Sequence, residues 1–478
     1  MITRLQVLSE DERAQLHQRT LDVLASTGLR VDTTRGRQIL REAGAAVDDE
    51  TRVVRFPRSL VDEALRLAPG RFRLGARRPG WDLQMGSGDC ALLVDGEALF
   101  TVDWETHERR LGTVEDWRRT TRLIDAMDEI GAYWHMIEEH DRPDTMGDFV
   151  AYLRSLFRNF SKHVQDPIAH ADQAPWLLEV LQVVFGDKET IRRHHPLSFL
   201  LCPQSPLVID GPYTDAYLAL AGWDIPVALM PMPLMGATSP ASLISTTLLG
   251  NCEVLGMLCL IQAAAPGTPC IYAPALAVMN PRSGGYGGGP IEHGLLGAAA
   301  TEMARYYGLP AESSGLGSDA HVPDIQAAYE RAMNGLMPML SWPDLLVGPG
   351  LLGGSMVLSL EQMVIDVEIF RMARRAHQGI RANEGRWLEA SIADVGPAGH
   401  FMAEEPTVQA IRDGEWYISQ LGIHDTFEDW EAVRRPTVLQ DAREQVDQIL
   451  SSHEPLPLDE GVERELEEIE RRARRRVG

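Results

Sequence analysis

The sequence contains almost no lysine. Lys162 and Lys188 are the only lysines, so the 45 basic residues are nearly all arginines. They are outnumbered by 69 acidic residues, which gives a formal net charge of −24. Nucleic acids and polyphosphates are bound by clustered cations, so we do not expect a chain of this charge to bind them.

Cysteine is also scarce, and no segment has the composition of a signal peptide. The five cysteines form no CxxC pair, and all but Cys90 lie in apolar runs, which predicts buried side chains in a reducing compartment. The longest apolar stretch, 243–265, is interrupted by Asn251 and Glu253 and is therefore predicted to be a buried helix and not a membrane span. We predict a cytoplasmic protein that is not bound to a membrane.

Three patterns follow one another along the 478 residues. Residues 1–70 contain amphipathic segments that predict helices at 9–27, 34–43 and 57–67. Residues 71–380 begin with short β runs separated by turn residues. Residues 381–478 are charged and again helical, and their Glu/Arg-rich tail is predicted to be a solvated helix, or else a subunit contact. We therefore expect a central domain between two helical extensions.

The central domain alternates short apolar runs with helical patterns. Eight pairs can be counted, with predicted strands at 90–94 or 98–102, then 131–137, 163–168, 196–202, 225–230, 269–274, 307–310 and 345–347. Short buried strands that alternate with helices indicate a parallel sheet, and eight pairs indicate closure into a (β/α)8, or TIM, barrel. Active sites of such barrels lie at the carboxyl ends of the strands.

The stretch 315–330 joins the seventh predicted strand to its helix. Pro323 and Asp324 open that helix, because proline suits a first helical position and Asp suits the helix dipole. Apolar residues at helical spacing then predict one buried stripe, formed by Ile325, Ala328, Tyr329, Ala332 and Leu336. The loop before the helix would hold Ser318, Asp319 and His321 at the strand's exit.

Other strand exits are apolar and stiffened by proline. They read Cys202-Pro-Gln-Ser-Pro, Met230-Pro-Met-Pro and Tyr272-Ala-Pro-Ala-Leu. This pattern is typical either of packing under the barrel rim or of a cavity for an apolar or cationic group. In the second case Tyr133, Trp134 and Tyr272 are the candidate aromatic faces, which attract quaternary ammonium by about 0.5–2 kcal/mol each.

Two further segments have competing interpretations. The exit of the second strand is crowded with possible metal ligands (His135, Glu138, Glu139, His140 and Asp141), but no HExxH spacing is present. Residues 284–289 are rich in glycine but lack the following Lys and Ser/Thr of a phosphate loop, which favours a mobile loop at the barrel mouth.

Six short segments form an ordered set that spans nearly the whole chain. They are Leu24-x-x-Thr-Gly, Leu40-Arg-Glu-Ala-Gly-Ala, Arg109-Arg-Leu-Gly-Thr-Val-Glu-Asp, Met235-Gly-Ala-Thr-Ser-Pro, Ser318-Asp-Ala-His-x-Pro-Asp-Ile-Gln-Ala-x-Tyr-Glu and Val395-Gly-Pro-Ala-Gly-His-Phe. In this set the chain resembles the trimethylamine methyltransferase family. The resemblance implies a (β/α)8 barrel that passes a methyl group from a methylated amine to the cobalt of a corrinoid protein.

The founding members of that family carry pyrrolysine in the loop before the Ser-Asp-Ala segment. That position falls at about Gly317, and residues 316–318 offer no electrophile. The chain is therefore similar to the non-pyrrolysine branch, whose members demethylate quaternary amines such as glycine betaine. The alternatives are a tertiary amine donor or another methyl acceptor such as a folate, a metal-dependent lyase or hydrolase using His135 to Asp141, and a betaine-binding protein without turnover.

A quaternary amine needs no general acid to leave, so no acid–base catalyst and no metal ligand are predicted. The resemblance and the strand exits together predict a substrate site made of Tyr133, Trp134, His135, His163, Gln204, Met230, Met232, Tyr272, Ser318, Asp319 and His321, with Gly317 at the pyrrolysine position. His135, His163 and His321 are the candidates for binding a substrate carboxylate. We expect cobalamin to be carried by a partner corrinoid protein, or supplied free, with docking near 284–289 and 315–321, and we expect a homo-oligomer.

Overall fold

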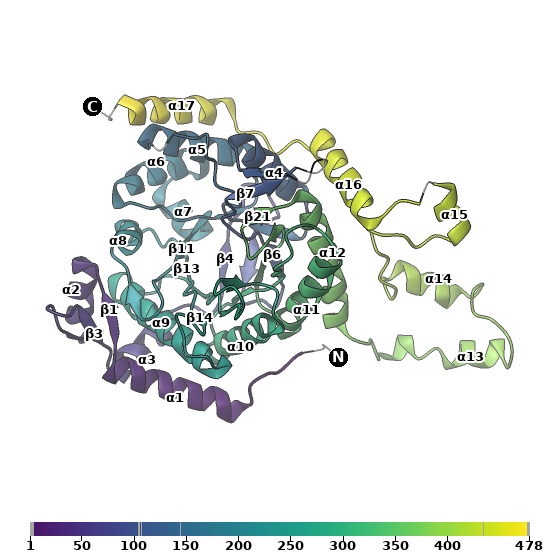
Figure 1. The fold of residues 1–478 in the computed structure, drawn as a ribbon, viewed down its shortest axis with the longest axis horizontal. Helices are drawn as coiled ribbons and strands as arrows, with labels where there is room; N and C mark the ends of the chain where they lie inside the picture. The colour runs from purple at the N-terminus through teal and green to yellow at the C-terminus, as the bar shows by residue number, and fades with distance from the viewer. Residues whose placement is uncertain (1–3, 104–105, 107, 144, 434, 476–478) are drawn as a thin grey trace.

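A closed barrel of eight parallel strands forms the centre of the molecule (Figure 1). A computed structural model describes residues 4–475 apart from 104, 105, 107, 144 and 434. Its barrel strands are β6 (Ala91–Leu93), β9 (Ile130–Tyr133), β10 (His163–Gln165), β11 (Leu197–Leu201), β13 (Val227–Leu229), β15 (Cys270–Tyr272), β18 (Glu312–Ser314) and β19 (Leu345–Val347). Each strand pairs with the next, β19 pairs with β6, and a bridge between Tyr272 and Ala311 joins β15 to β18. The predicted TIM barrel is confirmed.

Helices surround the strands. They are α4 (Val114–Ala126), α5 (Met146–Asn159), the 3-10 turn η1 (Ala171–Gln173), α6 (Ala174–Phe185), α7 (Lys188–His194), α8 (Pro212–Ala219), α9 (Leu243–Ala264), α10 (Ile291–Tyr307), α11 (Ile325–Ser341) and α12 (Leu360–Gln378). Thr113 begins α4 with a capping box, in which Asp116 is its partner. By length and composition α9 is apolar enough to cross a membrane, but most of it is buried inside the protein.

The seventh strand lies later in the chain than the sequence pattern predicts. Tyr307 ends α10, and Gly308 turns the chain in a left-handed conformation, so the apolar run 307–310 is not a strand. The strand is instead the polar triplet that begins at Glu312, whose two carboxyl oxygens accept from Gln165 Nε2 at 3.0 and 2.9 Å inside the barrel. Burial raises the pKa of Glu312 to about 8. The carboxyl group is therefore mostly uncharged at pH 7, which allows it to lie in the barrel interior.

The N-terminal extension is not purely helical. The three predicted helices are present as α1 (Glu10–Ser26), α2 (Thr34–Glu42) and α3 (Arg58–Leu67). Between them, β1 (Leu29–Val31), β2 (Ala46–Val47) and β3 (Val53–Arg55) form a sheet with β12 (Val208–Ile209). Strands of two or three residues carry too little periodicity to be recognised in a sequence. A hairpin of β4 (Phe72–Leu74) and β5 (Leu83–Met85) then leads to the barrel.

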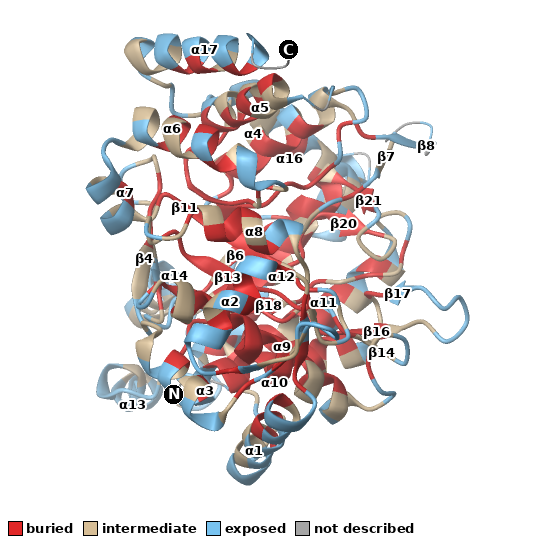
Figure 2. Cartoon of the chain, turned by 90° about the vertical axis from the view of Figure 1, so that its left-hand side faces the viewer, coloured by how far each residue is buried: buried red, intermediate tan, exposed pale blue. Residues whose placement is uncertain are grey.

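Two small sheets lie over the carboxyl end of the barrel (Figure 2). One contains β7 (Phe100–Val102), β8 (Arg109–Leu111), β20 (Leu351–Leu352) and β21 (Val357–Leu358). The other contains β14 (Leu234–Met235), β16 (Ala277–Met279) and β17 (Tyr286–Gly287). The run 98–102, the second choice for the first barrel strand, therefore belongs to a covering sheet. The two sheets narrow the access to the barrel mouth.

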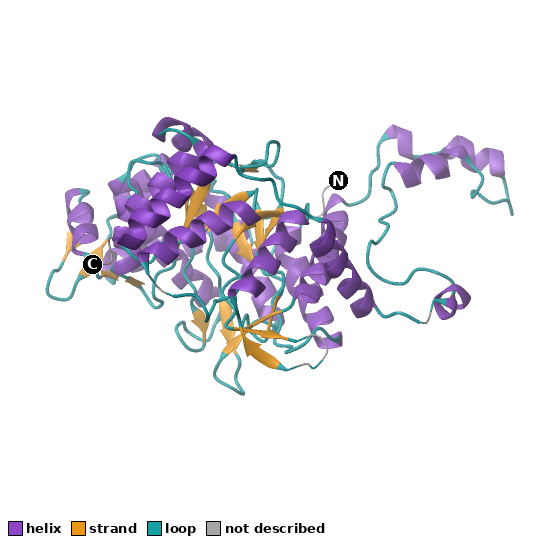
Figure 3. Ribbon diagram, turned by 90° about the horizontal axis from the view of Figure 1, so that it is seen from above, coloured by secondary structure: helices purple, strands orange, loops and turns teal. Residues whose placement is uncertain are grey.

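The C-terminal extension has two parts that differ in packing. Residues 379–437, here called the arm, contain the 3-10 turn η2 (Glu384–Arg386), α13 (Glu389–Val395), α14 (Glu405–Arg412) and α15 (Phe427–Ala432), and they reach away from the barrel (Figures 1 and 3). The chain then returns as α16 (Val438–Ser452) and α17 (Glu460–Arg475). Against the prediction of a solvated tail, α17 packs on α5 and α6 and buries Leu466, Ile469 and Ala473.

The apolar stripe predicted to be buried on α11 faces outward. Ile325 is 84% exposed and Tyr329 is 58% exposed. The inner side of the helix instead carries Arg331 and Asn334, which bond to backbone carbonyls of the loops at the barrel mouth. The prediction was wrong because helical periodicity identifies an apolar face but does not reveal that polar residues are needed inside.

Candidate active site

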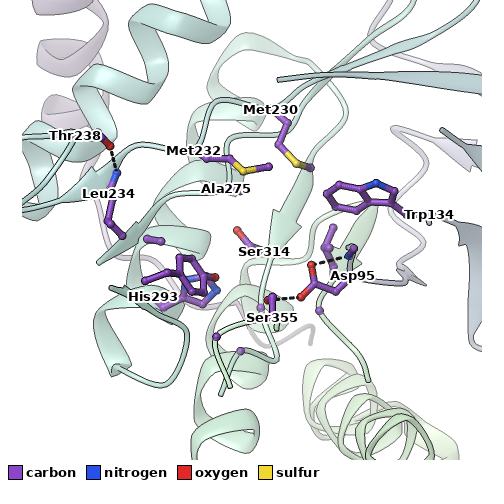
Figure 4. A pocket seen from close by; sticks show the side chains of 18 residues that line it. Asp95, Trp134, Met230, Met232, Leu234, Thr238, Ala275, His293, Ser314 and Ser355 are labelled. Atoms are coloured by element: carbon purple, nitrogen blue, oxygen red, sulfur yellow. Dashed lines mark hydrogen bonds between the residues drawn. The ribbon is translucent and has the colours of Figure 1, made fainter. Parts of the chain in front are cut away.

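A cavity of about 380 Å³ opens at the carboxyl ends of the barrel strands (Figure 4). TIM barrels carry their active sites at this end. The lining residues follow several different strands; they are Asp95, Gly96, Trp134, Met230, Met232, Leu234, Thr238, Ala275, Ala277, Tyr286, His293, Ser314, Gly315, Gly317, Val347, Gly348, Gly354 and Ser355. Of the residues predicted for the substrate site, the structure brings Trp134, Met230, Met232 and Gly317 together here.

Apolar side chains form one wall of the cavity. Met230 and Met232 follow β13 and are separated by Pro231, and Ala275 follows β15 near them (Figure 4). Methionine is flexible and polarizable, so it adapts to the shape of a bound apolar group. Met232 is 45% exposed and therefore reaches the opening of the cavity.

Asp95 and Trp134 give the cavity a charged side and an aromatic side (Figure 4). The Asp95 carboxylate accepts hydrogen bonds from the N–H of Gly96 at 3.0 Å and from the hydroxyl of Ser355 at 2.7 Å. Burial raises the pKa of Asp95. A Cβ at Gly96 would lie 2.3 Å from the carbonyl oxygen of His135, so only glycine permits this close approach. The pair can attract a cation that has no hydrogen to donate.

Two other polar atoms at the cavity have no hydrogen-bond partner within the described part of the chain. The Oγ of Ser314 and the Nδ1 of His293 are buried and have no hydrogen-bond partner among the described residues. Burial lowers the pKa of His293 to about 4, so its ring is neutral at pH 7. The Ser314 hydroxyl, in contrast, can donate a hydrogen bond at any ordinary pH. It is therefore a donor available to a ligand.

Gly317 is packed against the glycine-rich loop. A Cβ at this position would lie 2.4 Å from the carbonyl oxygen of Gly288, so the two backbones touch where a side chain would otherwise be. The Asn334 amide holds the same loop by donating to Gly288 O at 3.0 Å and to Gly289 O at 2.9 Å. Asp319 accepts from the N–H groups of both glycines at 2.8 and 3.1 Å. Residues 284–289 and 315–321 thus form one connected rim.

The remaining rim residues predicted for the site do not line the cavity. The Ser318 hydroxyl donates to Glu330 at 2.7 Å, which fixes the loop in the same way as Asp319 does. His321 is exposed, and a Cβ at Gly353 would lie 3.1 Å from its Nδ1. Gln204 is exposed in the hairpin-like turn that pairs with Val208.

Tyr133, Tyr272 and His163 lie elsewhere in the barrel. The hydroxyl of Tyr133 accepts from Trp117 Nε1 at 2.8 Å, on the side of the surrounding helices. The hydroxyl of Tyr272 donates to Asn251 of α9 at 2.9 Å. The ring of His163 lies between Gly75 O at 3.0 Å and the Ser198 hydroxyl at 2.9 Å. These three side chains bond within the fold and do not reach the cavity.

His135 lines a separate polar cleft of about 330 Å³, together with Glu139, Tyr152 and Asp166. Its Nε2 lies 3.1 Å from Glu139, and Tyr152 donates to Asp166 at 2.5 Å. Burial alone would lower the pKa of His135, but the ion pair with Glu139 raises it to about 9. Within the described residues no three His, Cys, Asp or Glu side chains are grouped as for a metal ion.

Sequence reasoning missed Asp95 and Ser314, together with Tyr286, His293 and Ser355 of the lining. Asp95-Gly96 has the composition of a turn, which hides its position two residues after the end of β6. Ser314 ends β18, the strand that was placed too early in the chain. Correct bounds for β18 are the signal that would have placed Ser314 at the mouth, whereas the predicted strand 90–94 already ended beside Asp95.

The fold and the cavity define a TIM-barrel protein with a ligand site at its mouth. A model of the family described as trimethylamine methyltransferase (MTTB) matches residues 1–477. The chain therefore belongs to the trimethylamine methyltransferase family, a family of methyltransferases.

Curated relatives and a solved structure agree with this assignment. The chain is 31% identical to the trimethylamine methyltransferase MttB of Desulfitobacterium hafniense over 461 residues, 96% of this chain and 92% of the relative. It is 27% identical to a glycine betaine methyltransferase of the same species over 471 residues, 98% and 97% of the two chains. The Methanosarcina barkeri monomethylamine methyltransferase superposes with a TM-score of 0.51 at 11% identity, over 92% of both chains, and this likeness concerns the fold alone.

Proposed function

We propose that this protein transfers a methyl group from a quaternary amine, glycine betaine first, to the Co(I) of a corrinoid held by a partner protein. The observation that carries the proposal is the pairing of Asp95 and Trp134 in an otherwise apolar cavity at the barrel mouth. The similarity to a glycine betaine methyltransferase supports the choice of substrate. The free cysteines among the described residues agree with a reducing compartment, and we place the reaction in the cytoplasm.

The reaction does not require a catalytic acid or base from the protein's side chains. A quaternary nitrogen keeps the electron pair of the broken carbon–nitrogen bond and leaves as a neutral tertiary amine, so it needs no proton. The corrinoid supplies a strong nucleophile that accepts the methyl carbon. The enzyme has to hold one N-methyl group toward the opening of the cavity and keep water away from it.

Each wall of the cavity has a part in holding the substrate. The Trp134 face and the Asp95 carboxylate attract the onium head, which cannot form hydrogen bonds. Met230 and Met232 fill the space around its methyl groups. The unpaired Ser314 hydroxyl donates to the substrate carboxylate, a role that none of His135, His163 and His321 has the position to take.

The cavity also fits a tertiary amine as the methyl donor, but the observations support this substrate less strongly. A protonated tertiary amine could donate its N–H to Asp95, and relatives at 31% identity are named trimethylamine methyltransferases. Gly317 argues against this alternative, because it stands where founding trimethylamine enzymes carry pyrrolysine and the Gly288 carbonyl lies 2.4 Å from its Cβ position. We therefore place the quaternary amine first.

The corrinoid protein would dock on the connected rim of residues 284–289 and 315–321. This rim borders the cavity, and Tyr286 on it is 42% exposed. A docked partner would close the cavity and bring the cobalt to the projecting N-methyl group. Binding of a separate corrinoid protein is consistent with a cavity that is far too small for a whole corrinoid ring.

The test is methylation of free cob(I)alamin by the purified enzyme, measured spectroscopically with glycine betaine, proline betaine, carnitine and trimethylamine. We expect turnover with a betaine and none with trimethylamine. Turnover with trimethylamine alone would select the tertiary amine instead. Binding of betaine, measured by calorimetry, without methylation of either free cobalamin or a corrinoid protein would indicate a binding protein.

A further inference from the structure

A second cavity of about 380 Å³ lies at the amino ends of the barrel strands, and we call it the amino-end pocket. Its lining includes Gly86 and Gly88, which precede β6. It also includes Ala311 and Asp344, which directly precede β18 and β19. These three strands are neighbours in the barrel. The candidate active site lies at the carboxyl ends of the strands, so the barrel separates the two cavities, and the proposed methyl transfer does not use the amino-end pocket.

Three arginines line the amino-end pocket, and none of them forms an ion pair with a described residue. They are Arg4, Arg71 and Arg305. Arg305 donates one hydrogen bond, to the carbonyl oxygen of Ser341. Partial burial and the neighbouring charge of Arg4 lower the pKa of Arg305. The chain has 69 acidic residues and 45 basic ones, so three arginines that face one cavity without a carboxylate partner call for an explanation.

Asp344 is the one carboxylate in the lining, and it is already engaged by the backbone. Its Oδ1 accepts from the N–H of Gly86 at 2.5 Å, and its Oδ2 accepts from the N–H of Ala311 at 2.8 Å. Burial raises the pKa of Asp344. Glu302, whose charge also reaches this cluster, is paired with Arg13 at 3.1 Å. The protein therefore leaves the three guanidinium groups of the pocket without a neutralising partner among the described residues.

Close backbone contacts hold the loops around the amino-end pocket. A Cβ at Gly86 would lie 2.2 Å from the carbonyl oxygen of Gly70, and a Cβ at Gly70 would lie 2.5 Å from that of Gly308. The indole N–H of Trp342 donates to the carbonyl oxygen of Gly88 and joins a further segment to these loops. The loops are thus fixed relative to one another before a ligand binds, which lowers the cost of binding.

We propose that the amino-end pocket binds the phosphate group of a small molecule, either inorganic phosphate or a phosphate monoester. Three guanidinium groups and one carboxylate leave an excess of two positive charges. This excess matches the charge of about −1.5 to −2 that a phosphate monoester carries at pH 7. The planar guanidinium group binds two phosphate oxygens by parallel hydrogen bonds. A single carboxylate would offset only half of the excess charge, so phosphate is the better match.

The amino-end pocket is compatible with the acidic character of the whole chain. The net charge of −24 still argues against nucleic acids, which need cations spread along an extended surface. The pocket instead gathers three cations at one point and has room for one small ligand. A net charge summed over the whole chain does not reveal such a local cluster. The proposal is also independent of which amine is demethylated, because the pocket lies at the other end of the barrel.

The test is calorimetric titration of the full-length protein with inorganic phosphate, at an ionic strength held constant with sodium chloride. We expect saturable binding at one site per chain. The melting temperature should rise with phosphate concentration, because the ligand binds the folded state. Glycerol 3-phosphate as a second titrant distinguishes the two sources of the phosphate group. Tighter binding of glycerol 3-phosphate would assign the site to a phosphate monoester, and tighter binding of inorganic phosphate would assign it to the free ion.

Two variants test whether the arginines form the site. Arg71→Gln and Arg305→Gln each remove one charge and keep most of the side chain, so each should weaken phosphate binding by about tenfold or more. Both positions are exposed, so folding should be retained, and circular dichroism checks this. Arg412→Gln, which replaces an exposed arginine outside the pocket, is the matched control and should leave the affinity unchanged.

Three results would overturn the proposal. The first is the absence of saturable binding at millimolar phosphate. The second is binding of acetate as tight as that of phosphate, which would show that the site does not select a dianion. The third is an unchanged affinity in both Arg71→Gln and Arg305→Gln, which would place the bound phosphate elsewhere. None of these measurements uses methylation of cob(I)alamin, so failure of this proposal and failure of the proposed function are distinguishable.

Discussion

The apolar cavity and the polar cleft are lined by two consecutive residues that follow β9, and the surroundings of these two residues are opposite in character. Trp134 faces an apolar cavity in which the Ser314 hydroxyl is left without a partner, whereas His135 faces a polar cleft in which it is paired with Glu139. The cleft is rich in titratable groups, yet they satisfy one another. Polar groups that a protein leaves unpaired beside a cavity are thus better evidence for a ligand than a dense cluster of acids and bases.

The largest effect on substrate binding is expected at Asp95. Asp95→Asn removes the charge but keeps the shape, and we expect the KM for glycine betaine to rise by about thirtyfold or more, because loss of one member of a buried charge pair costs about 2–5 kcal/mol. Steady-state kinetics measure this. Asp166→Asn, which removes a buried carboxyl group from the polar cleft instead, is the matched control and should leave KM unchanged. Equal increases in KM for the two variants would mean that the cavity and the polar cleft contribute alike to substrate binding.

The pH dependence of binding gives an independent check on Asp95. Burial raises the pKa of this carboxyl group in the free enzyme, and only its ionised form attracts an onium ion. Affinity for glycine betaine should therefore increase as the pH rises through that raised pKa. Calorimetric titrations at several pH values should show this increase in the wild type and a flat profile in Asp95→Asn.

Trp134 is expected to have the next largest effect. Trp134→Leu replaces an aromatic face by an aliphatic one and should weaken binding of glycine betaine by about 0.5–2 kcal/mol. The comparison is Tyr272→Phe, an aromatic residue of a barrel strand whose hydroxyl bonds to Asn251 outside the cavity. That change should lower the melting temperature without changing the affinity. A loss of affinity in Tyr272→Phe would place that ring in the site after all.

Ser314 should contribute less, and only for one kind of ligand. Ser314→Ala removes a single hydrogen-bond donor, so we expect a loss of about 1 kcal/mol for glycine betaine. Tetramethylammonium, which has the onium head but no carboxylate, should bind equally to both proteins. An equal loss for both ligands, measured by calorimetry, would mean that Ser314 shapes the cavity and does not bind the carboxylate.

His135 should affect stability and leave substrate binding unchanged. Its folded pKa of about 9 lies above the ordinary value of 6.5, so the stabilisation from the Glu139 pair is complete below pH 6.5 and is lost as the pH rises through 9. Denaturant unfolding should show this decline in the wild type and less of it in His135→Gln. If His135→Gln instead raises KM for glycine betaine, the cleft takes part in substrate binding.

The barrel was predictable because its signals are local and repeated. Alternating apolar runs identify seven of the strands, and the Thr113 capping box marks the start of α4. The seventh strand was misplaced because Glu312 and its neighbours are polar, and their burial depends on Gln165, which is distant in sequence.

The composition of the site was less predictable than its position. Met230 and Met232 of the proline-stiffened exit line the cavity together with Trp134, and their role in substrate binding stays a prediction. Tyr133 and Tyr272 have equally suitable residue types, but each turns outward to a hydrogen-bond partner on a surrounding helix. Which way a side chain turns at a strand exit depends on such distant partners, and a single sequence does not contain that information.

The contact between Gly317 and Gly288 has a consequence for engineering this protein. Introducing a reactive amino acid at residue 317, by amber suppression for example, would force the two backbones apart, because 2.4 Å separates the Gly288 oxygen from the first side-chain atom. The Asn334 and Asp319 bonds oppose that separation. Converting this enzyme to the pyrrolysine type would therefore require a redesigned segment 284–289 together with the new residue, and a lone codon change would not suffice.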